Sequence, residues 1–279
     1  MVCNTKSVTI NVHELLFILI LSFLFNFRTE AQIAGEGQKF SLGVKIGGGV
    51  SWASFSDKAQ KDTFSVLPAP GFAVGGFINF PLKNDFLVQM EFGYSKKGRI
   101  IKDRLLTNTS TYQFVDATML LRKSYHFNLA PNVPSEWFFN IGPEVSYWLS
   151  GKGNLRAEGP GYPYKIVFDG VPDGTTKHLY YNSANRWLFS LVAGVGFRAP
   201  MGPHQSITTE MRFVSGHTNL GRKDYDYPTA LWYGVLGYVD TLHVNMKSVV
   251  ISVSYSWAFN SIEQKMGKST KKVKNKRRR

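Results

Sequence analysis

The sequence predicts an all-β fold, namely an eight-stranded antiparallel up-and-down transmembrane β-barrel with short periplasmic turns and long external loops. Three observations predict it. Eight segments alternate between large apolar residues and small or polar ones, the chain starts with an export signal, and no later apolar run approaches the length of a transmembrane helix. The alternation also explains why the mean hydropathy is only −0.15 although 43% of the 279 residues are hydrophobic.

Residues 1–31 have the composition of a cleaved secretory signal peptide. A short apolar core, residues 15–25, precedes the small residues Thr29 and Ala31 that suit signal peptidase, so cleavage is predicted after Ala31. The alternative, an uncleaved anchor, would need about 20 apolar residues to cross the bilayer as a helix. The only cysteine, Cys3, lies in this segment, so the mature chain is predicted to lack disulfides and cysteine-based metal sites.

The first three predicted strands cover residues 40–52, 71–80 and 86–96. Because successive side chains of a strand point to opposite faces, a period of two assigns each residue to a lipid face or a lumen face. Glycine, serine and a few charged residues occupy the lumen faces. The lipid faces consist of Phe40, Leu42, Val44, Ile46, Val50, Trp52, Phe72, Val74, Ile78, Phe80, Val88, Met90, Phe92 and Tyr94.

The other five predicted strands cover residues 112–127, 137–149, 187–198, 206–215 and 248–259. The first of these is the least regular. The last has the clearest alternation, because its bulky face ends in Tyr255, Trp257 and Phe259 while its other face is small and mostly hydroxylated. Aromatic residues at the end of a lipid face are typical of the girdle at a membrane edge.

The connections alternate in length, and this alternation predicts the topology. Those after the second, fourth and sixth strands are short and contain proline: residues 81–85, 128–136 and 199–205. The others are long: residues 53–70, 97–111, 150–186 and 216–247. Outer-membrane barrels have short periplasmic turns, so both termini are predicted to be periplasmic. The alternative, a soluble lipocalin-like barrel, would have to bury the bulky faces and expose the small ones.

Three segments carry a family resemblance: PGFAVGGFINFPLKNDFLVQMEFGYSKKG (residues 70–98), FFNIGPEVSYWLSGKG (138–153) and TTEMRFVSGHTNLG (208–221). They resemble the PorT-like outer-membrane β-barrel family of Bacteroidota, which is related in architecture to OmpA-type barrels. The resemblance implies fold and location more strongly than activity, although the family's namesake resembles a component of the type IX secretion and gliding machinery. The segment FVDATMLLRKSY follows the family pattern only loosely, and the basic C-terminal tail departs from it.

The lumen faces contain four acids and four bases. In a barrel whose interior is only wide enough for side chains, unpaired charges are costly, so a neutralising ion-pair network is predicted. The alternative is a narrow ion pathway lined by rings of charge. The residues are Lys45, Glu91, Asp116, Arg122, Glu144, Arg198, Glu210 and Arg212.

The sequence predicts no catalytic, cofactor or metal site. Ser215, His217 and Glu210 are residue types of a hydrolytic triad, but the alternation turns Ser215 outward and Glu210 inward. His204, His217 and His243 lack the spacing of metal ligands. The protein is therefore predicted not to be an enzyme.

Two long connections are rich in aromatic residues, which suit either recognition of a surface ligand or packing of the loops on one another. The sequence leaves both interpretations open. The residues are Tyr162, Tyr164, Phe168, Tyr180 and Tyr181 in the first loop and Tyr225, Tyr227, Trp232, Tyr233 and Tyr238 in the second.

Residues 260–279 form a basic tail that follows the predicted barrel, residues 32–259. With Glu263 it carries +8 of the formal net charge of +14. We expect it to be disordered and periplasmic and to contact peptidoglycan, anionic lipid headgroups or an acidic periplasmic or secretion-machinery protein; the alternative is a solvated run without a partner. Nucleic acid is absent from that compartment. The basic residues are Lys265, Lys268, Lys271, Lys272, Lys274, Lys276, Arg277, Arg278 and Arg279.

Two functions follow from these observations. The first is a non-enzymatic barrel embedded in outer-membrane lipid that serves as an anchor, scaffold or accessory of an envelope machine. The second is a ligand-recognition or transport barrel that uses its external loops.

Overall fold

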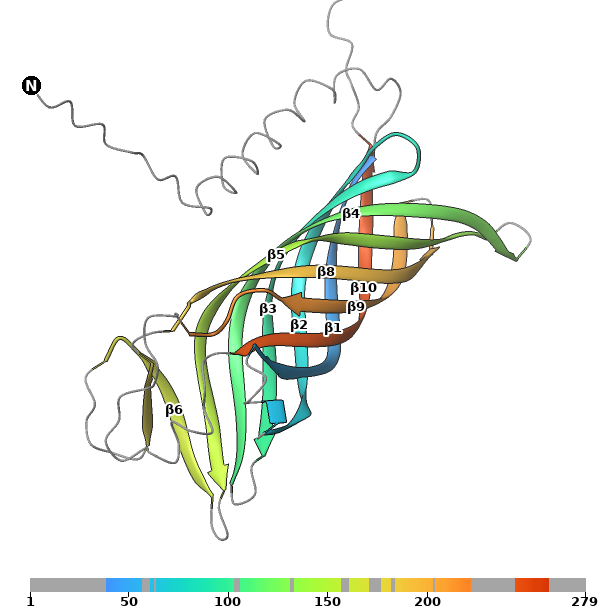
Figure 1. Cartoon of the computed structure of the whole chain (residues 1–279). Helices are drawn as coiled ribbons and strands as arrows, with labels where there is room; N and C mark the ends of the chain where they lie inside the picture. The colour runs from blue at the N-terminus through green and yellow to red at the C-terminus, as the bar shows by residue number, and fades with distance from the viewer. Residues whose placement is uncertain are drawn as a thin grey trace, which may run out of the picture. The chain divides into compact units, whose positions relative to one another are not determined.

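Ten strands joined in one sheet make up most of the described chain, and eight of them close into a ring (Figure 1). The computed structural model describes residues 39–56, 61–62, 64–102, 106–130, 133–156, 161–170, 177–181, 184–202, 204–221 and 244–260. The predicted signal peptide and the basic residues of the tail lie outside these ranges. Among the described residues, no helix is both long and apolar enough to cross a membrane.

The eight-stranded antiparallel barrel predicted from the sequence is confirmed. The ring runs β1-β2-β3-β4-β5-β8-β9-β10 and closes where β10 meets β1, while β6 and β7 extend the sheet from β5. The strands are β1 (Lys39–Phe55), β2 (Ser65–Pro81), β3 (Phe86–Lys102), β4 (Thr107–Ala130), β5 (Val133–Arg156), β6 (Tyr162–Phe168), β7 (His178–Tyr181), β8 (Trp187–Pro200), β9 (Gln205–Gly216) and β10 (Val244–Asn260).

Several strands continue beyond the predicted limits. The predicted long connection at residues 97–111 is wrong, because β3 and β4 run on through it as a paired hairpin that leaves only residues 103–106 as a link. The predicted loop at residues 150–186 contains the end of β5 together with β6 and β7. Alternation marks only the part of a strand whose outer face meets lipid, so these extensions carried no signal.

The ends of the barrel differ in their connections. At one end, here called the short-connection end, the links are residues 82–85, 131–132 and 201–204. The first of these turns through Asn84 and Asp85, both with φ near +60°, a conformation that Asn and Asp tolerate better than most residues. The opposite, long-connection end holds β6 and β7.

The outer surface is apolar between two aromatic girdles, as a lipid-facing wall requires. Large apolar side chains such as Val44, Ile46 and Phe92 are about two-thirds exposed on it. From Phe40 to Trp52 the wall rises roughly 30 Å, taking about 3.3 Å per residue and a tilt of about 40°. Ring contacts mark the girdles: Phe40–Phe259 (5.3 Å) and Tyr125–Trp137 (4.9 Å) at the short-connection end, and Phe72–Tyr94 (5.9 Å) and Tyr147–Trp187 (4.9 Å) at the other.

Inward-facing glycines occur where neighbouring strands approach each other most closely. A Cβ on Gly49 would lie 2.0 Å from the carbonyl oxygen of Val249 in β10, and one on Gly75 would lie 2.5 Å from that of Phe92 in β3. Both obstacles are backbone atoms, so the wall itself would have to shift. Glycine is thus required for the tight curvature of a small barrel.

We predict that Gly49→Ala destabilises the barrel by about 1–3 kcal/mol, because the added methyl group forces β1 and β10 apart. Gly48→Ala is the matched control, since a Cβ at the adjacent Gly48 meets no atom within 4 Å. Urea unfolding of the two variants in lipid vesicles measures the difference, and equal midpoints would contradict the prediction.

Candidate functional site: the charged barrel interior

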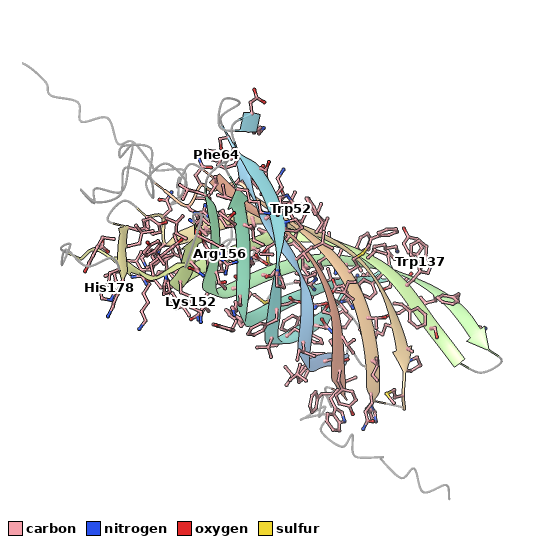
Figure 2. All side chains as sticks on the ribbon, turned by 90° about the horizontal axis from the view of Figure 1, so that it is seen from below. Trp52, Phe64, Trp137, Lys152, Arg156 and His178 are labelled. Atoms are coloured by element: carbon pink, nitrogen blue, oxygen red, sulfur yellow. The ribbon has the colours of Figure 1, made fainter. Side chains whose placement is uncertain are left out.

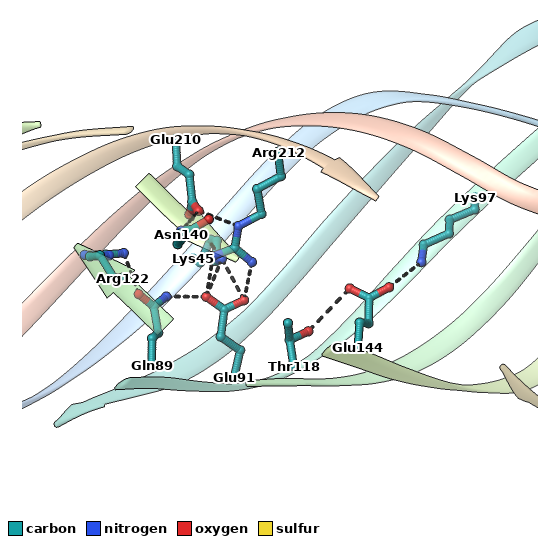
Figure 3. Close-up of polar contacts among 10 residues, drawn as sticks. All are labelled: Lys45, Gln89, Glu91, Lys97, Thr118, Arg122, Asn140, Glu144, Glu210 and Arg212. Carbon is teal, nitrogen blue, oxygen red and sulfur yellow. Dashed lines mark hydrogen bonds and ion pairs between the residues drawn. The ribbon is translucent and has the colours of Figure 1, made fainter. Parts of the chain in front are cut away.

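The centre of the barrel holds an ion-pair cluster built on Glu91 and Arg212 (Figure 3). The Arg212 guanidinium donates to both oxygens of Glu91, at 2.6 and 2.7 Å, and its Nε donates to Glu210 at 2.6 Å. The Lys45 ammonium lies 2.6 Å from Glu91 and 3.6 Å from Glu210. These side chains come from β1, β3 and β9, so the cluster ties together opposite parts of the wall.

Neutral side chains add further hydrogen bonds to this central cluster. Gln89 donates to Glu91 and Asn140 donates to Glu210. Arg122 donates to the Gln89 carbonyl oxygen, and its guanidinium lies 3.7 Å from the centre of the buried Phe138 ring. Arg122 is thus held by an amide and an aromatic face. Each acid of the cluster accepts bonds from several donors, which is how buried carboxylates are stabilised.

A second cluster lies nearer the long-connection end and depends on Lys97. Its ammonium lies 3.0 Å from Glu144 and 3.9 Å from Asp116. Ser146 donates to Asp116 at 2.5 Å, and Thr118 donates to Glu144 at 3.3 Å. The sequence analysis had assigned Lys97 to a loop. β3 continues past Tyr94, so residues 89, 91, 93, 95 and 97 share its inner face, but the next outward residue is Lys96 and not an apolar one, so the sequence contains no signal of this continuation.

Arg198 joins a separate pair near the short-connection end. It donates to Glu136 at 3.0 Å and to Ser206 at 2.8 Å, and Ser206 is in turn 2.7 Å from Ser256. Glu136 was absent from the predicted set because it was assigned to a turn. The structure therefore brings seven of the eight predicted residues into the two inner clusters and adds Lys97 to them.

The two inner clusters together contain four bases and four acids. The central cluster has three cations, Lys45, Arg122 and Arg212, against Glu91 and Glu210; the second has one cation against two acids. Between them lies a cavity of about 100 Å³, lined on one side by these charges and on the other by the inward glycines of β1, β2 and β3. A cavity of this size has room for several water molecules, and the charged side chains supply the polar part of a lining that is mostly apolar.

An apolar plug fills the barrel towards the long-connection end. Trp148 is fully buried at its centre, with the Tyr112 ring edge-on at 5.0 Å and Phe168 of β6 at 4.9 Å. The hydroxyl of Tyr164 donates to Asn108 at 2.8 Å, which fixes β6 against the inside of β4. The other buried members include Ala53, Phe55, Phe64, Ile101, Phe114, Ile166, Leu179, Tyr181, Leu188, Leu220, Val244 and Met246.

The hydrolytic residue types do not form a site. Ser215 pairs across the sheet with Leu191, whose side chain is 43% exposed on the outer wall, whereas Glu210 faces inward in the central cluster. The backbone N–H of His217 donates to the Phe189 carbonyl at 2.9 Å. Within the described ranges, no group of three or more His, Cys, Asp or Glu side chains could hold a metal ion.

A family model described as "Outer membrane protein beta-barrel domain" matches residues 30–220. The chain belongs to this family. The match includes seven of the eight ring strands, and it agrees with the apolar outer wall: the protein is an outer-membrane β-barrel. The predicted outer-membrane location and the contact with membrane lipid are thereby confirmed.

Several solved outer-membrane barrels are similar to this chain in fold. Ail of Yersinia pestis has 12% identity and a TM-score of 0.33, covering 78% of this chain and 98% of its own. Neisserial surface protein A has 12% identity and a TM-score of 0.37, with 79% and 97% covered. The N-terminal barrel of Pseudomonas aeruginosa OprF has 10% identity and a TM-score of 0.32, with 80% and 100% covered. No curated protein matches the chain.

We predict that Glu210→Gln destabilises this outer-membrane barrel by about 3–5 kcal/mol, because it leaves buried cations with one acid fewer. Glu210 has a side chain only 3% exposed, and both Arg212 and Lys45 approach it. Urea unfolding in phosphatidylcholine vesicles, followed by tryptophan fluorescence, measures the effect.

Asp85→Asn is the matched control for Glu210→Gln. Asp85 is 52% exposed and pairs with Lys123 at 3.7 Å, so its loss is expected to change stability by less than about 1 kcal/mol. Similar unfolding midpoints for the two variants would show that the inner cluster does not stabilise the fold.

Proposed function

We propose that the protein is a non-conducting, non-enzymatic outer-membrane barrel that serves as an anchor, scaffold or accessory of an envelope machine. The observation that carries the proposal is the filled interior, which holds ion pairs at its centre and the apolar plug at the long-connection end. The PorT-like resemblance favours a type IX secretion or gliding machine. In this proposal the long-connection end faces outside and both termini lie in the periplasm.

The packing of the interior supports a non-conducting role. An ion moving through the barrel would have to separate the two-pronged contact between Arg212 and Glu91, with N···O distances of 2.6 and 2.7 Å. It would then have to pass Trp148 and its neighbours, all buried and mostly apolar. The carboxylates of the central cluster are already bound to several donors, so they offer little to replace the hydration shell of a passing ion.

The aromatic residues of the first long loop favour packing over recognition. Tyr164, Tyr180 and Tyr181 are at least nine-tenths buried, and Phe168 packs on Trp148. Tyr162, at the start of β6, is the exposed one among these five, at 52%. The aromatic residues of the second loop lie outside the described ranges. We therefore propose the scaffold function in preference to the ligand-recognition function.

We predict that the wild-type protein shows no stable open level in planar lipid bilayers, because its interior is occupied by paired charges and the plug. Single-channel recording at moderate voltage measures this. A reproducible open level that persists after the protein is shown to be fully folded would overturn the proposal.

The basic tail supplies the second part of the proposed role. Its nine basic residues, residues 265–279, are far more concentrated than the charge elsewhere in the chain. Extended at about 3.3–3.6 Å per residue, residues 260–279 reach roughly 65–70 Å, enough to approach the cell wall from a periplasmic end of β10. We propose that it binds peptidoglycan carboxylates or an acidic periplasmic protein.

Deleting residues 265–279 is predicted to abolish co-sedimentation with purified peptidoglycan, or recovery of an acidic periplasmic partner after crosslinking in cells. Raising NaCl from about 0.1 M to about 1 M should release the intact protein as well, because the Debye length falls from about 10 to about 3 Å. A variant with all nine basic residues changed to Gln keeps the length of the tail but not its charge. It should lose binding as the deletion does, because the proposal assigns binding to the charge. Unchanged recovery after deletion, at low salt, would remove the idea.

A further inference from the structure

Basic side chains form a row across the sheet at the long-connection end, outside the girdle. Lys152 in β5 is the direct cross-strand partner of Lys165 in β6, and Lys165 is the partner of His178 in β7. Arg156 follows on the same face of β5, and Lys177 precedes β7. In Figure 2, Lys152 and His178 lie on the side of the barrel away from Trp137.

The row lies on the outer face of the sheet because the sheet's inner face is occupied. Lys152, Lys165 and Arg156 are exposed. The residues that alternate with them, Tyr164 and Ile166 in β6, are buried in the plug. The outward direction of Lys165 is thus determined by the packing of Tyr164 and Ile166 behind it, and Lys152 lies opposite it on the same face.

This arrangement is unfavourable for the stability of the isolated protein. Like charges directly opposite each other on neighbouring strands destabilise a sheet. The strands offer no acid to offset Lys152 and Lys165: residues 107–113, 150–156, 162–168 and 178–181 contain neither Asp nor Glu, and Asp169 follows β6 four residues beyond Lys165. A row that is kept at a cost to folding is expected to have an anionic ligand.

The height of the row identifies the chemistry of that ligand. The girdle contact of Tyr147 with Trp187 marks the membrane edge on this side, and Lys152 comes five residues later in β5. At about 3.3 Å per residue and a tilt of about 40°, that is roughly 13 Å above the edge, and a lysine side chain can reach back several ångströms. The ammonium groups therefore lie at the level of lipid headgroups. Strands are about 4.8 Å apart, so the row spans roughly 10 Å.

We propose that Lys152 and Lys165, flanked by Arg156, Lys177 and His178, bind the phosphate groups of an anionic glycolipid in the outer leaflet. The proposal rests on the orientation put forward under Proposed function, with the long-connection end outside. Binding would fix the β5–β6–β7 extension against the membrane surface. The cross-strand repulsion would then become an attraction to a shared anion.

The test uses the full-length protein in neutral detergent with diphosphoryl lipid A, and native mass spectrometry measures the lipid retained. We expect the variant Lys152→Gln/Lys165→Gln to retain lipid A roughly 30-fold more weakly, since each lysine near an anionic headgroup contributes about fivefold. Lys152→Arg/Lys165→Arg should retain it. Lys61→Gln/Lys83→Gln, which removes the same charge from two other exposed positions, should also retain it.

Three results would overturn the proposal: undiminished retention by Lys152→Gln/Lys165→Gln, an equal loss in Lys61→Gln/Lys83→Gln, or complete displacement of lipid A by an equal concentration of inorganic pyrophosphate. The last would point to free phosphate instead of a lipid. Because detergent exposes both ends, these results do not depend on orientation. Labelling of Lys152→Cys by a membrane-impermeant maleimide on intact cells tests the orientation separately.

Discussion

The rest of the structure depends on closure of the backbone hydrogen-bond ladder around the ring. In hydrocarbon there is no water to satisfy an unpaired N–H or C=O, so a sheet can cross the membrane only without open edges. The long hairpin of β4 and β5 and the seam between β10 and β1 provide that closure. Once the ring is closed, each strand must present apolar residues outward, and whatever faces inward must fill a narrow interior.

The narrow interior explains both the glycines and the charges. Where strands curve most tightly, only glycine leaves the neighbouring backbone in place, as at Gly49 and Gly75. Elsewhere long charged side chains span the space and pair across it. The central cluster has one cation more than it has acids, and the second cluster has one acid more than it has cations. The net charge of one cluster therefore cancels that of the other, and residues of both line the cavity between them. The formal charges of these two clusters cancel only when both clusters are considered together.

The membrane-spanning part of the fold could be predicted from the sequence because lipid imposes a strict period of two. That constraint also placed Glu91, Glu210 and Arg212 on the inner face. It ends at the girdle: beyond it, both faces of a strand meet protein or water, and apolar residues no longer mark the outside. The extension of β3 that carries Lys97, and β6 and β7, were missed for this reason. The pairing of each acid with a particular base depends on the stagger of the strands and on the length of the side chains. The apolar–polar alternation gives no information about either.

One extra residue in β5 determines what lies on each side of the sheet above the girdle. The pairing of β4 with β5 shifts register between Gln113 and Phe114, so that Leu149 has no partner in β4 and the alternation of β5 reverses. Above this bulge Gly151 and Gly153 face inward, where their missing side chains leave room for Ile166 and Tyr164. Without the reversal, Lys152 would point into the apolar plug, where an unpaired ammonium is costly. The packed plug and the like-charged outer row are therefore two consequences of the same bulge, and the burial behind the row stabilises a sheet whose outer face repels itself.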